Sequence, residues 1–244
     1  MIKYLNFSAA VVATAFATAA QAATVSPMVI DLQTSGRNVV ANVTVSNTSD
    51  KPLTIEAVPQ ALQPTDTGFA PSEGNTEDLL VMPPTALIAP GRTQTFRVQW
   101  IGDPAAMSSS HFYVGMNQLP VKLPEGQSAV QVVYNFNVLV NVGPANGKAE
   151  LKVVDSKIVT QEGKNYPSVA VTNSGSTYGY ISQKGLKLTQ TDQSGKEVFS
   201  KSLSGAEVEQ LVGYGIVAVN QTRTMVVPVS LPDANGTVTA SISE

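Results

Sequence analysis

The sequence contains no cysteine and a single histidine, His111, among its 244 residues. The first absence excludes disulfides, thiol nucleophiles and thiolate metal sites, and one histidine cannot form a multi-histidine zinc centre. Ser108–Ser110 precede His111, but no acidic residue lies nearby in the sequence, and successive residues of a strand point to opposite faces. These residues therefore do not predict a nucleophile and its base. We expect a protein that is not an enzyme and that holds no metal and no cofactor.

Clustered positive charge is also missing. The chain has 15 Lys and Arg residues against 18 Asp and Glu residues, and its formal net charge is −3. No basic cluster could follow a phosphate backbone, and no glycine-rich loop precedes a helical pattern. Nucleic acid and nucleotides are therefore not expected as ligands. Beyond residue 22, no apolar run approaches the roughly 20 residues of a membrane-spanning helix, so we expect no membrane span.

The first 22 residues have the pattern of a signal peptide. Lys3 is followed by an apolar, alanine-rich run over 7–19, and Ala20-Gln21-Ala22 is a small-x-small cleavage pattern. Cleavage there would leave 222 residues of 244 and would change the formal net charge to −4. We expect an exported protein of about two domains, each with a core large enough to fold without disulfides.

Short strand-like runs separated by turn residues make up the rest of the chain, as is typical of β-sandwiches. In the first half, Phe96, Val98 and Trp100 alternate with Thr95 and Arg97, so one face of that strand points inward. The strands predicted there are Thr24–Leu32, Val39–Asn47, Leu53–Gln60, Asp78–Met82, Thr93–Trp100, His111–Gln118 and Gln127–Val142. Seven strands suit an immunoglobulin-like sandwich.

A second set of strands follows Pro144-Ala145-Asn146-Gly147, whose proline cannot extend a sheet and whose Asn-Gly favours a turn. The strands predicted there are Leu151–Ile158, Pro167–Asn173, Lys184–Thr191, Glu197–Leu203, Tyr214–Val219, Thr222–Leu231 and Gly236–Ile242. Ser204 and Glu207 match a capping box and predict a helical turn through Leu211. We therefore expect a signal peptide at 1–22, a first domain at 23–143 and a second domain at 144–244.

The longest predicted strand, Gln127–Val142, carries apolar residues at every second position. Its 16 residues compare with about 5–6 in a typical strand. The run could be a long core strand of its own domain. It could also lie at a sheet edge, where unpaired backbone groups and an apolar row would be completed by a strand of a partner.

Several landmarks, taken in order, resemble the periplasmic chaperones of chaperone–usher pilus assembly. They are Val25-Ser26-Pro27, Val43–Asn47, Met82-Pro83-Pro84, Ala89-Pro90-Gly91, Phe96-Arg97-Val98, Phe112-Tyr113-Val114 with Leu119-Pro120, the long alternating strand, and Pro144. Each landmark is weak alone, but their order extends over essentially the whole chain after the signal peptide.

The resemblance implies an all-β fold of two immunoglobulin-like β-sandwich domains in a bent arrangement. It implies a periplasmic chaperone that stabilises pilus subunits by donor-strand complementation and delivers them to an outer-membrane usher. The subunit would bind along the last strand of the first domain. The residues that correspond to the family's donor positions, or follow them on the same face, are Val130, Val132, Tyr134, Phe136 and Val138.

The sequence departs from the family at the residues that hold the subunit's terminal carboxylate. Many members place an arginine in the first strand and a lysine late in the donor strand, where this chain has Met28 or a neighbour and Leu139. Ser109 and Gly143 stand near the positions of an interdomain ion pair. These departures resemble the divergent, archaic branch. A buried carboxylate needs a basic partner, and the candidates are Arg97, Arg92, Lys184 and Arg223.

A pilus subunit or adhesive surface β-sandwich protein is the alternative function. Subunits usually lack one strand and carry an N-terminal donor extension, whereas here the predicted strands begin almost directly after residue 22. The sequence does not identify the subunit or the fibre, and it leaves open whether the free chaperone associates with itself.

Overall fold

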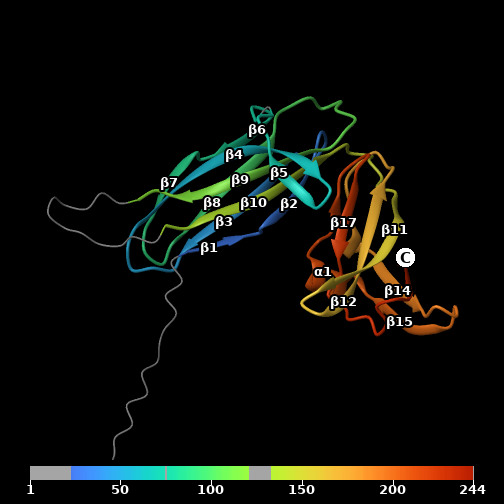
Figure 1. Cartoon of the computed structure of the whole chain (residues 1–244). Helices are drawn as coiled ribbons and strands as arrows, with labels where there is room; N and C mark the ends of the chain where they lie inside the picture. Colours follow the sequence, from blue (N-terminus) through green and yellow to red (C-terminus); the bar gives the residue numbers. More distant parts are fainter. Residues whose placement is uncertain (1–22, 75, 121–132, 244) are drawn as a thin grey trace, which may run out of the picture.

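A computed structural model describes residues 23–74, 76–120 and 133–243. The chain forms two β-rich lobes set at an angle, with the N-terminal half in the longer lobe (Figure 1). The prediction of an all-β protein with two sandwich domains in a bent arrangement is confirmed. The described part of the chain contains no helix long and apolar enough to cross a membrane.

The first domain consists of strands β1 to β10. They are β1 (Ala23–Ser26), β2 (Val29–Gln33), β3 (Val40–Asn47), β4 (Leu53–Thr65), β5 (Gly68–Pro71), β6 (Leu79–Met82), β7 (Thr85–Ile88), β8 (Thr93–Trp100), β9 (Ser110–Gln118) and β10 (Asn135–Gly143). One sheet has the order β1-β3-β8-β6, and the facing sheet has the order β2-β10-β9-β4-β5 with β7 also paired to β4.

The strand predicted at Thr24–Leu32 is two strands in the structure. β1 pairs antiparallel with β3 in one sheet, and β2 pairs parallel with β10 in the other. Pro27 lies between them, and because proline has no backbone N–H it cannot continue a sheet's hydrogen bonding. The first described segment of this domain therefore links the two sheets.

The structure also contains strands that the sequence analysis missed. β4 continues past Gln60 to Thr65 and turns back into β5, and β7 forms after Pro83-Pro84. β4 contains Pro59 and Pro64, and β5 ends at Pro71, although prolines within a run argue against a strand. The missing N–H of Pro59 would point to the same side of β4 as the Ala57 N–H, which bonds to the carbonyl of Pro84 just before β7. No strand pairs with β4 on that side at Pro59, so the proline interrupts no hydrogen bond between strands.

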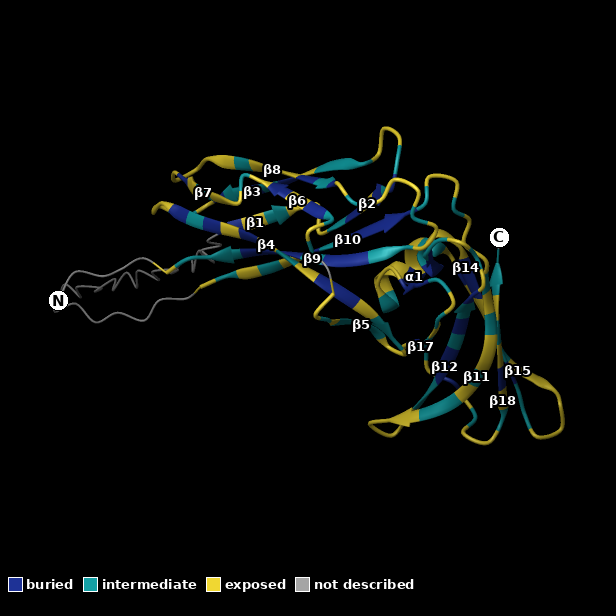
Figure 2. Cartoon of the chain, turned by 90° about the horizontal axis from the view of Figure 1, so that it is seen from above, coloured by how far each residue is buried: buried dark blue, intermediate teal, exposed yellow. Residues whose placement is uncertain are grey.

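The core of the first domain lies between its two sheets. Phe96, Val98 and Trp100 are buried, while Thr95 and Arg97 point outward, which confirms the predicted alternation of β8. Figure 2 shows buried segments running along the middle of this domain. Burying such side chains stabilises the fold by about 1.5–3 kcal/mol each.

The second domain has its own sheets and one helix. Its elements are β11 (Leu151–Gln161), β12 (Lys164–Asn173), β13 (Gly179–Tyr180), the 3-10 helix η1 (Ile181–Gln183), β14 (Gly185–Thr191), β15 (Glu197–Leu203), α1 (Gly205–Val212), β16 (Ile216–Val217), β17 (Thr222–Val226) and β18 (Thr237–Ser243). The sheets have the orders β11-β12-β17, β13-β16 and β15-β14-β18. The predicted capping box is confirmed, since Ser204 and Glu207 form both of its hydrogen bonds at the start of α1.

One buried asparagine occupies the same place in both domains. Asn47 ends β3, and its Nδ2 donates to the carbonyl oxygen of Ile88 at 2.9 Å. Asn173 ends β12, and its Nδ2 donates to the carbonyl oxygen of Val217 at 3.0 Å. Both side chains are at most 1% exposed. Each side-chain amide thus satisfies a carbonyl of a neighbouring strand or turn that water cannot reach.

We predict that Asn47→Ala destabilises the protein by about 1–3 kcal/mol, because the Ile88 carbonyl would stay buried without a donor. Urea unfolding of the mature chain measures this change. Asn42→Ala is the matched control, because Asn42 lies exposed on the same strand and its loss should cost no more than about 0.5 kcal/mol. Equal effects of the two substitutions would contradict the prediction.

Candidate functional site

The last strand of the first domain has a neighbour on both sides along only part of its length. From Leu139 to Val142, β10 lies between β9 and β2. From Asn135 to Val138, it pairs with β9 alone among the described residues. The Leu139 N–H donates to the Met28 carbonyl at 2.9 Å, where β2 joins the sheet. The first half of β10 is therefore an open sheet edge.

The direction of the backbone groups follows from this hydrogen bond. Backbone N–H and C=O groups of alternate residues point to the same side of a strand. The Leu139 N–H faces β2, so the backbone groups of Asn137 and Asn135 face the same, open side. The backbone groups of Tyr134 point to the other side, toward β9, and its carbonyl accepts the Gln118 N–H at 3.0 Å.

The predicted donor residues fall in different environments. Val130 and Val132 lie outside the described residues. Tyr134 and Phe136 are partly buried, and their rings stack at 6.4 Å with 15° between the planes. Phe136 packs against the first domain's core, whereas Val138 is fully buried inside that core. Val138 was predicted to contact a subunit, but its side chain packs inside the core of its own domain and is not exposed to a partner.

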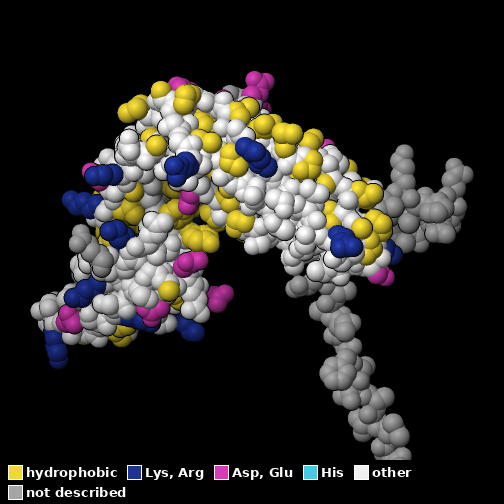
Figure 3. Space-filling view, turned by 180° about the vertical axis from the view of Figure 1, so that it is seen from behind, with side chains coloured by type: hydrophobic (Ala, Val, Ile, Leu, Met, Phe, Trp, Pro, Cys, Tyr) yellow, Lys and Arg dark blue, Asp and Glu magenta, His cyan; other side chains and the backbone are white. Residues whose placement is uncertain are grey.

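Three of the four basic candidates, Arg97, Arg92 and Lys184, have exposed side chains. Arg97 lies on the outer side of β8, in the sheet opposite β10, and Arg92 lies in the turn before that strand. Lys184 follows η1 in the second domain. On the viewed face in Figure 3, Lys and Arg side chains are scattered and form no dense cluster.

Arg223, on β17, is the candidate that the structure brings against the first domain. The neighbouring Thr224 N–H donates to the Asp66 carbonyl at 2.7 Å, in the turn between β4 and β5. The Arg223 side chain lies beside Gly68 in that turn. The long hairpin of β4 and β5, missed in the sequence, thus connects the two domains (Figure 1).

The guanidinium of Arg223 is only partly satisfied. Its Nη1 donates to the Ile216 carbonyl at 2.9 Å, while its buried Nε has no hydrogen-bond partner among the described residues. Burial lowers the pKa of Arg223, and the electrostatic influence of Tyr113 opposes that shift. No carboxylate within the described ranges forms an ion pair with it. An arginine remains charged in such a place and favours an anionic partner.

A network of hydrogen bonds joins the domains beside β2. Asp31 accepts hydrogen bonds from the hydroxyl groups of Tyr178, at 2.9 Å, and of Tyr180. The Tyr180 hydroxyl in turn accepts from Asn141 Nδ2 at 3.0 Å. Burial and the charge and hydrogen bond of Asp31 raise the pKa of both tyrosines, so they stay protonated donors. Sequence reasoning gave these residues no role, because their contacts join positions far apart in the chain.

His111 extends this network. Asn141 uses its Nδ2 as a donor to Tyr180, so its Oδ1 is the acceptor for His111 Nδ1 at 2.7 Å. Burial lowers the pKa of His111 to about 4, against smaller opposing effects of Asn141 and Asp31. The imidazole is therefore neutral near pH 7. It lies where the preceding loop enters β9, and it is buried at the domain junction.

The positions of the family's ion pair carry a neutral contact here. Ser109 Oγ accepts the Tyr178 backbone N–H at 3.1 Å and lies 3.2 Å from the hydroxyl of Thr177. A Cβ on Gly143 would come within 2.3 Å of that hydroxyl, so only glycine fits. At this point the two domains are joined by close backbone packing and neutral hydrogen bonds rather than by an ion pair.

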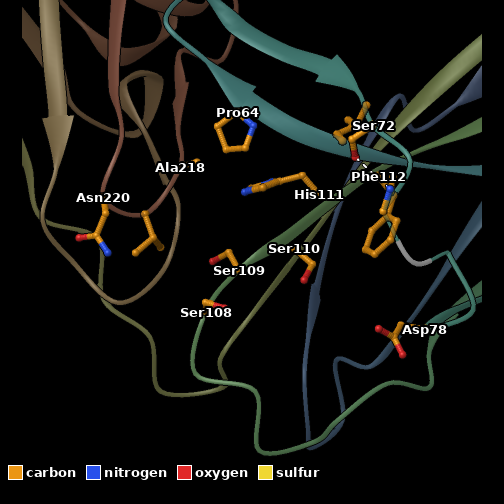
Figure 4. Close-up of a pocket in the computed structure, with 14 residues that line it drawn as sticks. Pro64, Ser72, Asp78, Ser108, Ser109, Ser110, His111, Phe112, Ala218 and Asn220 are labelled. Carbon is orange, nitrogen blue, oxygen red and sulfur yellow. Dashed lines mark hydrogen bonds between the residues drawn. The ribbon is translucent and has the colours of Figure 1, made fainter.

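A cleft of about 390 Å³ lies beside His111, between the hairpin of β4 and β5 and residues 218–220 of the second domain. Figure 4 shows the His111 ring reaching toward Ala218 and lying between Pro64 and Ser109. No hydrogen bond joins His111 to a serine among the described residues, and no three carboxylate or imidazole groups there could hold a metal. The geometry offers no activated nucleophile.

We predict that Asp31 and Tyr180 are energetically coupled. In a double-mutant cycle with Asp31→Ala and Tyr180→Phe, the coupling energy should be about 1–3 kcal/mol, because the hydroxyl and the carboxylate bond directly across the domains. Urea unfolding of the four proteins measures it. Combining Tyr180→Phe with Asn42→Ala should be additive within about 0.5 kcal/mol; coupling of similar size there would contradict the assignment.

Comparisons with known proteins agree on the architecture. The chain resembles the chaperone CfaA of class 5 fimbriae (TM-score 0.53, 12% identity, 91% of this chain and 99% of that chain covered) and the chaperone YadV (0.51, 17%, 91% and 92%). It also resembles a chain of the CsuC–CsuE chaperone–tip adhesion subunit pre-assembly complex from archaic Csu pili of Acinetobacter baumannii (0.52, 12%, 89% and 97%). At these identities the similarity is one of fold.

No curated protein matches the sequence. The sequence model of one family, described as the pili and flagellar-assembly chaperone, PapD N-terminal domain, matches residues 24–148. This match includes every strand of the first domain and more than half of the chain. The chain therefore belongs to the family of PapD-like pilus-assembly chaperones.

Proposed function

We propose that this protein is a periplasmic chaperone that binds pilus subunits by donor-strand complementation and delivers them to an outer-membrane usher. The open edge of β10 over Asn135–Val138 carries the proposal. An exposed edge with unpaired backbone groups is normally protected or completed by another strand. A subunit strand placed beside Asn135 and Asn137 would satisfy those groups.

The side chains beside this edge supply the apolar contact. Tyr134 and Phe136 lie on one face of the chain, and the alternation of the sequence predicts the same face for Val130 and Val132, which lie outside the described residues. In strand addition, backbone hydrogen bonds supply affinity and alternate side chains fill pockets of the partner. We assign these four residues to subunit binding and leave Val138 out, because it is buried in its own domain.

Arg223 is the proposed anchor for the subunit's terminal carboxylate. It is a partly buried cation without a carboxylate partner among the described residues. Tyr113, which influences it, pairs with Leu139 on β10, at the point where the open edge ends. A carboxylate arriving there would be stabilised by a charge-assisted hydrogen bond. Arg97, Arg92 and Lys184 have more exposed positions and are weaker candidates.

The predicted signal peptide at 1–22 supports export to the periplasm. Family membership supports a pilus subunit as partner and an usher as recipient. The alternative function, a pilus subunit or adhesive surface protein, is not favoured, because the core of the first domain is closed between two complete sheets. A subunit that awaits a donor strand would expose that core.

The direct test is co-expression with pilus subunits encoded beside this protein, followed by purification on a tag placed after Glu244. A subunit that is otherwise degraded should co-purify in a one-to-one complex. If none does, the fold stands but the subunit-binding role fails.

We predict that Asn137→Pro weakens subunit binding at least tenfold. Proline removes the N–H that faces the open side and places its ring there, while the bonds between β10 and β9 stay intact. Binding of the purified subunit by calorimetry measures the loss. Asn137→Ala keeps the N–H and should bind normally. If Asn137→Pro binds as tightly as Asn137→Ala, the open edge of β10 is not the binding strand.

We predict that Arg223→Ala weakens binding of a subunit with a free C-terminus by roughly 30-fold or more, since a buried carboxylate would lose its charged partner. Lys184→Ala removes an exposed cation of the same domain and should change affinity little. A subunit with an amidated C-terminus should bind wild type and Arg223→Ala about equally. A large effect of Lys184→Ala alone would move the anchor to Lys184.

A further inference from the structure

The only histidine in the sequence lies where the two domains meet. His111 is 4% exposed, and its ring contacts Phe69 of β5 at 4.5 Å and Tyr178 of the second domain at 5.6 Å. It therefore packs between the hairpin that reaches the second domain and the second domain itself (Figure 4). The subunit-binding function assigned above gives this residue no role.

One nitrogen of this imidazole is satisfied and the other is not. Nδ1 carries the proton that is donated to Asn141 Oδ1. Nε2 is buried and has no partner among the described residues. In the neutral ring, Nε2 carries a lone pair and is a hydrogen-bond acceptor. Leaving an acceptor unsatisfied in the interior costs less free energy than burying a charged donor without a partner. Protonation would turn Nε2 into a buried cationic donor without an acceptor.

Few charged groups are placed to stabilise such a cation. β2 contributes Asp31, whose oxygen already accepts from Tyr178, Tyr180 and Asn141. Tyr178 and Tyr180, from the second domain, remain neutral. The residues from the other packed elements, Asn141 of β10, Phe69 of β5 and Leu62 of β4, do not titrate. Asp78 lines the same cleft, and Arg223 lies beyond Gly68 in the adjoining turn.

We propose that protonation of His111 separates the two domains at this junction and thereby weakens the hold on the pilus subunit. The second half of the proposal rests on the proposed function, because it takes the cleft between the domains as part of the subunit site. A protonated ring can reach water only by moving into the adjoining cleft, away from Phe69 and Tyr178. The Tyr178 contact joins the domains directly, and the Phe69 contact holds the β4–β5 hairpin that bonds to β17, so the movement loosens the junction.

The direction of the pH effect follows from linkage. The pKa of His111 is about 4 in the closed junction and near the ordinary 6.5 when the ring reaches water. The open form binds more protons between these values, so the closed form is fully favoured above pH 6.5 and loses that advantage as the pH falls toward 4. The difference limits the shift of the open–closed equilibrium to roughly 300-fold.

The test uses the mature chain carrying a tag without histidine. Because His111 is the only histidine, its imidazole carbon-bound proton gives a single NMR signal whose titration midpoint can be read directly. Small-angle scattering at the same pH values reports the separation of the domains. We expect a midpoint well below 6.5 and a rise in the radius of gyration over the same pH range.

His111→Gln is the matched control, since glutamine keeps a hydrogen-bonding group but does not titrate in this range. It should keep the neutral-pH dimensions down to pH 4.5 and should retain subunit at that pH, where the wild type releases it. A midpoint near 6.5, a constant radius while His111 titrates, or the same expansion in His111→Gln would each overturn the proposal. A failure of both proteins to bind subunit at pH 7 would instead contradict the proposed function, and the scattering result would still stand.

Discussion

The parallel pairing of β2 with the second half of β10 determines most of what is distinctive in this structure. The pairing begins at Leu139, which closes one part of the strand and leaves Asn135–Val138 open. β2 also carries Asp31, whose carboxylate accepts hydrogen bonds from the hydroxyl groups of Tyr178 and Tyr180 in the second domain. One short strand thus defines both the length of the open edge and the attachment of the second domain.

The features that could be predicted from the sequence are local. The alternation of Phe96, Val98 and Trp100 identified a buried face, and the spacing of Ser204 and Glu207 identified the start of α1. Periodicity and capping depend on residues a few positions apart, so the sequence contains them directly. The family resemblance then supplied the expectation of a pilus subunit as partner and of a binding strand, which no local pattern could give.

The missed features depend on pairing over long sequence distances. The change of sheet at Pro27 requires two different partners, β3 and β10, for adjacent segments. Asp31 and Tyr180 meet across 149 positions, and Arg223 acquires its place only when the β4–β5 hairpin reaches β17. The sequence likewise could not show that the strand of Arg97, another anchor candidate, belongs to the sheet opposite β10.

At the domain junction, Asp31 and Arg223 carry opposite charges and differ in how well their hydrogen-bonding groups are satisfied. Asp31 is exposed and accepts hydrogen bonds from Tyr178, Tyr180 and Asn141. Arg223, on the far side of His111 and Phe69, has a buried nitrogen without a partner among the described residues. A buried N–H without an acceptor on a partly buried cation destabilises the free protein, and an arriving carboxylate would reduce that cost. If Arg223 is the anchor, as proposed, part of the affinity for an anionic chain end would come from satisfying this buried N–H, an advantage that an exposed basic residue does not offer.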